Sequence, residues 1–308
     1  MSLLSWLYGP MGAGKSTIAR TLAEMCEKKA LLAATFVFSR TASEERKNGD
    51  FLLPTIVSQL LQRFPELADV TLDAISVEGD LFERSRSTQL KRLLIEPFRI
   101  LADKNRLLPT ESDSHTSFGC LTGSARLIMI DGFDECEDIA TQVELLKIIA
   151  DASLRLLHPF RFLIISRPEA YISSAFEDKL VTSHPNKVRL RIHLNNEPDA
   201  ETDIKHYVTL EFDRMRSEHP HRHTLPFLWP PIGAVETLVQ RASKQFIYPS
   251  ISIQFIWKND DFPLRSLESI LKLDSVQCAE EKPLALLEEL YTFVLLKVSP
   301  KYLDIVAS

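Results

Sequence analysis

Cysteine, excess positive charge and long apolar runs are all scarce or missing in this chain of 308 residues. Its four cysteines lie far apart and form no C-x-x-C pair, which argues against a disulfide framework or a zinc site and favours a reducing, cytoplasmic compartment. The formal net charge of -6 gives no support for a surface that binds nucleic acid. No apolar run is long enough to span a bilayer, so we expect neither nucleic acid nor membrane among the partners.

The overall composition is that of a folded globular protein. Hydrophobic residues make up 45% of the sequence and charged residues 25%, and the length allows one large domain or two moderate ones. No internal repeat is visible in the sequence. Composition therefore excludes several classes of protein but selects no function.

The strongest motif of the sequence starts at residue 9 and fits the phosphate-binding pattern G-x-x-x-x-G-K-[ST] at every fixed position. Leu3–Tyr8 before the motif has the apolar character of a buried strand, and Thr17–Met25 after it has a helical pattern. Strand, glycine-rich loop and helix follow one another in the order that phosphate binding requires. A chance match in a turn is the alternative, and both flanks count against it. The residues expected to bind nucleotide are Gly9, Pro10, Met11, Gly12, Ala13, Gly14, Lys15, Ser16 and Thr17.

The residue types of this motif suit ATP or ADP with Mg²⁺. The glycines let backbone N–H groups converge on phosphate oxygens, because no Cβ blocks the curled backbone. The amino terminus of the following helix adds unpaired N–H groups and partial positive charge. We expect Lys15 to reach the β- and γ-phosphates and the Ser16 hydroxyl to ligate Mg²⁺.

A second motif places three acids at the end of an apolar run. Asp131 ends the run Leu127–Ile130 and can hold Mg²⁺ through water if it lies beside a phosphate loop. Asp134 and Glu135 follow, and either could orient or deprotonate the water that attacks the γ-phosphate. The alternative is an acidic turn that caps the following helix.

Arginines follow two other predicted strands. Arg167 comes after the apolar run Phe160–Ser166, where a cation could contact the γ-phosphate and stabilise developing charge. A surface arginine near a strand end is the alternative. Arg40 follows the run Leu31–Phe38 and could meet phosphate or a neighbouring subunit, although a plain surface arginine is the simpler interpretation.

Apolar runs of strand length alternate with helical patterns up to residue 194. This alternation predicts an α/β fold with a doubly wound, mainly parallel five-stranded sheet. Residues 187–194 alternate basic and apolar side chains, as in a strand at a sheet edge. Pro65 is expected to close a helix over residues 55–64, and the polar segment 103–124 is expected to form a surface loop.

The pattern of the sequence changes after residue 197. Helical segments follow from Ala200 to Val298, and His219–Pro231 is rich in proline and histidine, as in a linker or loop. The predicted domains are a P-loop NTPase core over residues 1–197, a helical lid subdomain over 198–280 and the start of a further, truncated subdomain over 281–308.

These motifs come in the order found in NACHT domains. The chain resembles the fungal NACHT proteins that have a nephrocystin three-like NTPase region. The segments that carry the resemblance are Gly9–Ser16, Phe36–Arg40, Ile130–Cys136, Ile165–Glu169, Ile204–Tyr207, Leu238–Tyr248 and Leu287–Tyr291.

The resemblance implies a signal-transduction ATPase of the STAND class, as in NLR-like proteins. In such proteins ADP holds a closed state, ATP promotes an open and self-associating one, and hydrolysis is slow. An effector domain and C-terminal repeats usually flank the NTPase. By position, the resemblance gives phosphate binding to Lys15, Mg²⁺ binding to Ser16 and Asp131, the extra acidic positions to Asp134 and Glu135, and the sensor arginine to Arg167.

One departure from the family concerns the predicted lid. The family usually has alanine after Tyr248, whereas this chain has Pro249, which should disfavour a continuous helix across the Tyr248–Pro249 bond.

Two other functions compete with that of a signal-transduction ATPase. One is an interaction module that holds nucleotide without turnover, and the other is a small-molecule kinase, against which the predicted lid and the acids at 131–135 argue. The sequence leaves the activating signal and the effector open.

Overall fold

A computed structural model describes residues 4–107, 126–156, 160–177, 190–194, 200–258, 262–273 and 285–297. The chain forms two compact units. The first consists of the residues up to Pro10 together with Lys15–His193, and the second consists of Met11–Gly14 together with the chain from Leu194 onward. The domain boundary predicted at residue 197 lies outside the described residues, so its position stays a prediction.

The first unit is built on five parallel strands in the spatial order β2-β3-β4-β1-β5. This confirms the predicted α/β class, and the parallel sheet fits a P-loop NTPase fold. β5 lies at the edge beside β1, as its alternating pattern predicted, although residues 187–189 lie outside the described part. The strands are β1 (Leu4–Tyr8), β2 (Leu32–Val37), β3 (Arg126–Asp131), β4 (Phe160–Ser166) and β5 (Leu190–His193).

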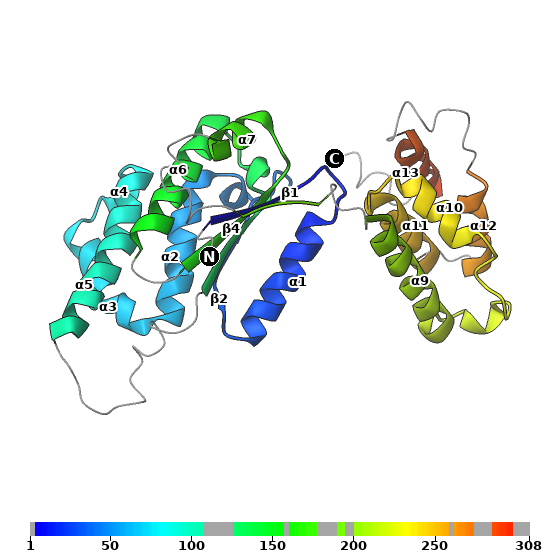
Figure 1. The fold of residues 1–308 in the computed structure, drawn as a ribbon, viewed down its shortest axis with the longest axis horizontal. Helices are drawn as coiled ribbons and strands as arrows, with labels where there is room; N and C mark the ends of the chain where they lie inside the picture. Colours follow the sequence, from blue (N-terminus) through cyan, green and yellow to red (C-terminus); the bar gives the residue numbers. More distant parts are fainter. Residues whose placement is uncertain are drawn as a thin grey trace. The chain divides into compact units, whose positions relative to one another are not determined.

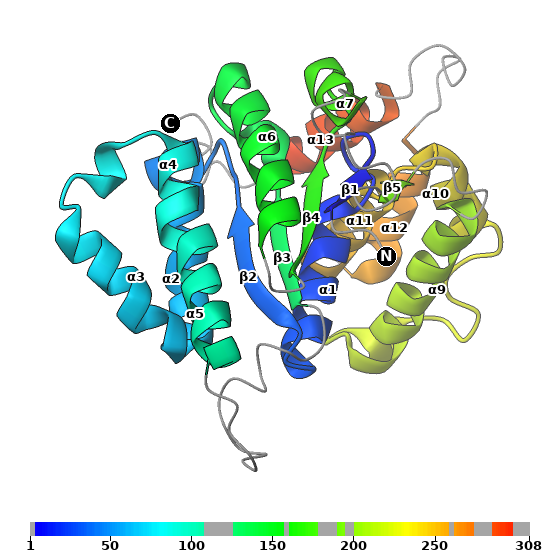
Figure 2. The same cartoon turned by 60° about the vertical axis from the view of Figure 1, so that its left-hand side comes forward.

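Helices cover both faces of this sheet, with α1 on one face and α6 and α7 on the other (Figure 1). Four further helices, α2 to α5, gather beside β2 (Figure 2). A π-helical turn at Lys91–Ile95 joins α4 to α5. The helices of the first unit are α1 (Lys15–Lys28), α2 (Leu52–Arg63), α3 (Pro65–Val77), α4 (Arg86–Leu90), α5 (Glu96–Leu107), α6 (Ile139–Arg155) and α7 (Ala170–Glu177).

Two details of the first unit correct the sequence predictions. Pro65 does more than close α2, because it also starts α3, in a first turn where its missing N–H is not needed. No helix was predicted over α3. The helix α5 continues to Leu107, into the segment 103–124 that was predicted as a loop, because most residues after Leu101 are strong helix formers. The rest of that segment lies outside the described residues.

The core of the first unit contains interlocked aromatic rings. Phe160 of β4 makes edge-to-face contacts with Phe64 and Phe98, at centroid distances of 6.1 and 5.3 Å. Trp6 of β1 stacks on Phe176 at 4.6 Å, and its indole N–H donates a hydrogen bond of 2.9 Å to the Ser166 hydroxyl. These contacts fix β1 against β4, the two strands whose ends carry candidate site residues.

The second unit is helical and has its own apolar core. Trp229, which is only 1% exposed, packs edge-to-face on Phe212 at 5.1 Å in that core. No helix in the described part of the chain has the length and apolar character needed to cross a membrane. The helices are α9 (Ala200–Glu218), α10 (Ala234–Ala242), α11 (Ile247–Lys258), α12 (Pro263–Leu271) and α13 (Ala285–Lys297).

The helix α11 corrects the prediction about Pro249. It runs from Ile247 to Lys258 without a break, so the Tyr248–Pro249 bond does not interrupt it. Pro249 is the third residue of α11, and in the first turn a backbone N–H has no intrahelical partner to lose. The ring of Pro249 is buried, so it adds to the packing of the unit.

Candidate functional site

The strand order brings the loops that carry the candidate residues to one edge of the sheet. β2, β3, β4 and β1 are neighbours and parallel, so their carboxyl ends lie at the same edge. Pairing places Val37 opposite Asp131, and Tyr8 opposite Ser166. The residues just beyond the four strand ends are therefore brought close together.

The loop between β1 and α1 surrounds the Lys15 ammonium group. Lys15 is the first residue of α1, and its Nζ donates hydrogen bonds of 2.8 Å to the carbonyls of Gly9 and Pro10. Met11–Gly14 form the middle of the loop, where both glycines have positive φ. Ser16 and Thr17 follow in the first turn of α1, which contains no acidic residue, so nothing on the helix itself neutralises its positive end.

Several charged groups act on Lys15. Burial lowers the pKa of its ammonium group, and the positive charge of Arg167 lowers it further. The carboxylates of Asp134, Asp131 and Glu135 oppose this change in the pKa. A lysine, an arginine and three carboxylates predicted from separate motifs therefore interact electrostatically in the folded protein.

Asp131 and Ser16, the two predicted Mg²⁺ ligands, are brought together. Asp131 ends β3 and is 6% exposed, and burial raises the pKa of its carboxyl group. Hydrogen bonds from the Ser16 hydroxyl and from the Gly132 backbone N–H, the latter of 2.9 Å, counteract that rise in the pKa. A hydroxyl beside a carboxylate provides the hard oxygen donors that Mg²⁺ prefers.

Gly132 lets the acidic loop pass close to the end of β2. It has φ of 67°, and a Cβ at this position would lie 2.6 Å from the carbonyl oxygen of Phe38. Any side chain here would meet that backbone oxygen and also strain the left-handed turn. The glycine at position 132 therefore allows the loop that carries Asp134 and Glu135 to pass close to Phe38.

Asp134 holds Arg167 through two hydrogen bonds. One carboxylate oxygen accepts from the Arg167 backbone N–H at 2.9 Å, and the other accepts from its Nε at 2.6 Å. Asp134 is 3% exposed, and this contact raises the pKa of the Arg167 guanidinium. Glu169 adds a more distant ion pair to Arg167 at 3.8 Å. In the structure Asp134 thus acts on Arg167, and its predicted role toward water stays a prediction.

Arg40 is the residue whose importance the sequence interpretation missed. Its backbone N–H donates to Glu135 Oε2 at 3.1 Å, and its guanidinium donates to the Asp134 carbonyl at 3.0 Å. Arg40 is exposed, as a surface arginine is, but both hydrogen bonds connect it to the acidic loop. Gln142 of α6, which was not considered, donates to the Cys136 carbonyl at 2.7 Å and holds the same loop from the other side. The signal for Arg40 was its place after β2, but only the strand order shows that β2 neighbours β3.

Comparison with known families identifies the family of this chain. A family profile described as nephrocystin 3, N-terminal, matches residues 1–167, which is more than half of the chain. The matched range includes the loop from Gly9 to Ser16 and the acids from Asp131 to Glu135, and it ends at Arg167. No curated protein matches the chain significantly. The chain belongs to the nephrocystin 3 N-terminal family.

Proposed function

We propose that this protein is a cytoplasmic, ATP-binding signal-transduction switch of the NACHT/STAND type that hydrolyses ATP slowly. Bound nucleotide changes its conformation and promotes self-association. The observation that carries the proposal is the electrostatic coupling of Lys15 to Asp131, Asp134, Glu135 and Arg167 at the ends of a parallel sheet. Membership in the nephrocystin 3 N-terminal family supports the same assignment.

The loop Gly9–Thr17 binds the phosphates of ATP or ADP in this proposal. Lys15 turns from the carbonyls of Gly9 and Pro10 to the β- and γ-phosphates, which are stronger, charged acceptors. The N–H groups at the start of α1 add partial positive charge on the same side. The absence of acids in the first turn of α1 suits an anionic ligand there.

Ser16 and Asp131 hold Mg²⁺ in this proposal. A dication beside Asp131 offsets the cost of burying its carboxylate, the same cost that raises its pKa. Held by Ser16 and Asp131, Mg²⁺ would supply positive charge that offsets the negative charge of the phosphates. The hydrogen bond between Ser16 and Asp131 keeps both oxygen donors in one place before the ion binds.

Arg167, Asp134 and Glu135 act on the γ-phosphate end. Asp134 occupies the backbone N–H and Nε of Arg167, so the outer guanidinium nitrogens remain for the phosphate. Glu135 accepts from Arg40 with one oxygen and uses the other to orient the attacking water. Arg40 positions Glu135 through this hydrogen bond.

Calorimetry of ATP and ADP binding with Mg²⁺ tests the proposal. Lys15→Ala should weaken binding by about a hundredfold or more, because it removes the only side-chain cation of the loop. Lys28→Ala, at the exposed far end of α1, is the matched control and should bind like the unchanged protein. An unchanged protein that binds neither nucleotide would refute the proposal.

A nucleotide-holding scaffold without turnover is the second candidate. The observation in its favour is that both candidate acids are already engaged, Asp134 by Arg167 and Glu135 by Arg40. Single-turnover hydrolysis with and without Glu135→Gln separates the two candidates. Slow turnover that the substitution abolishes selects the switch, whereas tight ATP binding with no turnover in either protein selects the scaffold.

A further inference from the structure

A loop of the second unit displays three large apolar side chains to solvent. Phe227 is 87% exposed, Leu228 75% and Ile232 fully exposed; we call these three residues the apolar tip. The segment from Leu225 to Val235 contains no polar side chain. Scattered exposed apolar residues are normal on protein surfaces, but three of them on one short loop are typical of a docking site.

The exposure of the apolar tip does not come from a loosely held loop. Trp229, inside the same loop, is buried against Phe212 and anchors it in the core. The Arg216 guanidinium donates hydrogen bonds of 3.3 Å to the carbonyls of Phe227 and Trp229. The Trp229 N–H closes a turn onto the Pro226 carbonyl at 3.1 Å. The loop is thus held so that its apolar side chains face outward.

The charges on the amino-terminal side of the apolar tip in sequence are positive, and Glu236 on its other side is paired with Lys205 at 3.1 Å. Residues 219–235 contain Arg222 and three histidines and no acidic residue. Arg222 and His223 are exposed, and the Arg222 guanidinium donates to the His219 backbone carbonyl at 3.4 Å and forms no ion pair with a residue of the described ranges. The apolar tip therefore combines an apolar end with a positive flank.

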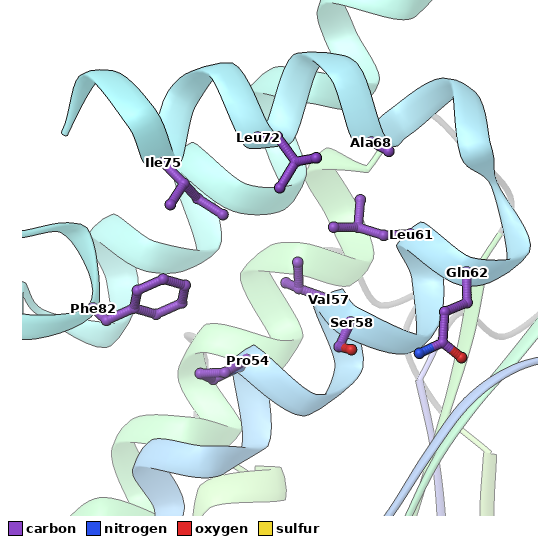
Figure 3. Close-up of a pocket in the computed structure, with 9 residues that line it drawn as sticks. All are labelled: Pro54, Val57, Ser58, Leu61, Gln62, Ala68, Leu72, Ile75 and Phe82. Carbon is purple, nitrogen blue, oxygen red and sulfur yellow. The ribbon is translucent and has the colours of Figure 1, made fainter. Parts of the chain in front are cut away.

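The first unit contains a groove of matching character between α2 and α3, which we call the α2–α3 groove (Figure 3). Its volume is about 360 Å³. Leu72 and Phe82 at its border are 54% and 50% exposed, although both are large and apolar. The lining residues, which Figure 3 labels, come from α2, from α3 and from the short turn Leu81–Glu83: Pro54, Val57, Ser58, Leu61, Gln62, Ala68, Leu72, Ile75 and Phe82.

The border of the α2–α3 groove is acidic. Asp69 and Asp73 flank Leu72 on the exposed side of α3, and Glu83 follows Phe82. None of these three acids forms an ion pair with another described residue, whereas the nearby Arg84 is neutralised by Asp80 and Glu78. The unbalanced charge at the groove is negative, opposite to that of the apolar tip.

We propose that the apolar tip of one copy of this chain inserts into the α2–α3 groove of a second copy. The proposal deepens, and rests on, the self-association in the proposed function. A tip that binds a different surface makes a heterologous contact, which repeats from copy to copy and builds a ring or a filament. A lipid surface fits less well, because juxtamembrane lipid recognition uses clusters of about four to eight basic residues and the tip segment has one arginine.

The test is sedimentation velocity over a concentration series, in ATP and in ADP, on the full chain and three variants. Phe227→Asp changes the tip, Leu72→Asp changes the groove, and Leu210→Asp is a control at an equally exposed leucine of α9. The tip and groove variants should each associate at least about tenfold more weakly than the unchanged protein, because each puts a charge into an apolar contact. The control should associate normally. All three substituted positions are exposed, so we expect circular dichroism spectra to stay unchanged.

Mixing the two defective variants gives the sharpest result. Phe227→Asp keeps an intact groove and Leu72→Asp an intact tip, so an equal mixture should form dimers but nothing larger.

A charge exchange between Arg222 beside the apolar tip and Asp73 at the border of the α2–α3 groove tests whether opposite charges stabilise the contact. Arg222→Glu alone and Asp73→Lys alone should each weaken association, and the two together in one chain should restore it.

Three results would overturn the proposal. They are a monomeric unchanged protein that binds ATP normally, a mixture that does not recover dimers, and binding to phosphatidylserine vesicles that only Phe227→Asp abolishes. The last would assign the apolar tip to lipid. Calorimetry on the same samples separates the two hypotheses. Lost ATP binding with intact tip-dependent association would refute the nucleotide switch and leave the tip–groove contact standing.

Discussion

The two units differ in what they bury. The first buries the carboxylates of Asp131 and Asp134 at the ends of its strands, whereas the described buried polar residues of the second are His219, Ser252 and Ser266. A buried carboxylate destabilises a fold unless hydrogen bonds or a cation compensate for its lost hydration. This difference supports the proposal that the chemistry takes place in the first unit.

The largest expected effect tests whether each unit depends on its own core. Phe160→Ala should destabilise the first unit by about 3–5 kcal/mol, because it leaves a cavity beside Phe64 and Phe98. Phe212→Ala should do the same to the second unit, where Trp229 packs on that ring. Urea unfolding of the two units can be followed separately by tryptophan signals, because Trp6 is the only tryptophan of the first unit.

The readout uses tryptophan variants. Replacing Trp229 and Trp257 with phenylalanine leaves the signal of Trp6, and replacing Trp6 leaves the signal of the second unit. We expect each core substitution to shift only the transition of its own unit. Equal shifts of both signals for both substitutions would show one cooperative structure and contradict the comparison.

A smaller effect is expected from the buried acid that holds Arg167. Asp134→Ala should destabilise the first unit by about 2 kcal/mol, because two hydrogen bonds from Arg167 lose their acceptor. Arg167 is 36% exposed on its side chain, so water recovers part of the loss. Glu169→Ala, which removes a pair at 3.8 Å, is the control and should change the unfolding free energy little. Equal changes in the unfolding free energy would mean that the Asp134–Arg167 pair stabilises the first unit no more than the Glu169–Arg167 pair.

Substitution of Asp131 should have the opposite effect on the stability of the first unit. Burial raises the pKa of its carboxyl group, so the native state binds a proton more readily than the unfolded chain. Stability from this group therefore falls as pH rises through the native pKa. Asp131→Asn should stabilise the first unit at neutral pH by up to about 1 kcal/mol, while it removes the further stabilisation by Mg²⁺ and ATP.

Asp138 provides the matched control for Asp131. It caps α6 by accepting from the Thr141 N–H at 2.7 Å, and this hydrogen bond lowers the pKa of its carboxyl group. Its contribution to stability is present above the unfolded pKa and is lost as pH falls. Asp138→Ala should therefore lower the thermal midpoint at pH 7, where Asp131→Asn raises it. A drop for both would show that Asp131 is a structural group.

The smallest expected effect concerns the second unit in mild acid. Burial lowers the pKa of His219, a hydrogen bond with the Trp257 backbone opposes this change, and the neighbouring His221 lowers the pKa further. Below an unfolded pKa of about 6.5 the unfolded chain binds the proton that native His219 does not, so stability falls as pH drops. His219→Asn, whose side-chain oxygen can replace Nδ1 as acceptor for the His221 N–H, should reduce this loss by about 1 kcal/mol or less. Thermal unfolding of both proteins at pH 7 and pH 5 measures it.

Much of the fold was predictable from local patterns. β3 is apolar from Leu127 to Ile130 and β4 from Phe162 to Ile165, as burial on both faces of a parallel sheet requires. The helix α3 was not predicted, because Pro65 was interpreted only as the end of α2, although a proline is equally suited to the start of a helix. Pro249 misled for the same reason, since its effect depends on how far it lies from the start of its helix.

The candidate site also combines features that short segments of sequence predict with features that depend on the tertiary structure. The sequence by itself determined the loop Gly9–Ser16 and the acid at the end of β3, because glycine conformation and strand burial are properties of short segments. Only the tertiary structure decided that Asp134 holds Arg167 and that Arg40 holds Glu135, across 33 and 95 residues of sequence. The order β2-β3-β4-β1 makes these loops neighbours, and which strands pair is settled by packing of the whole sheet.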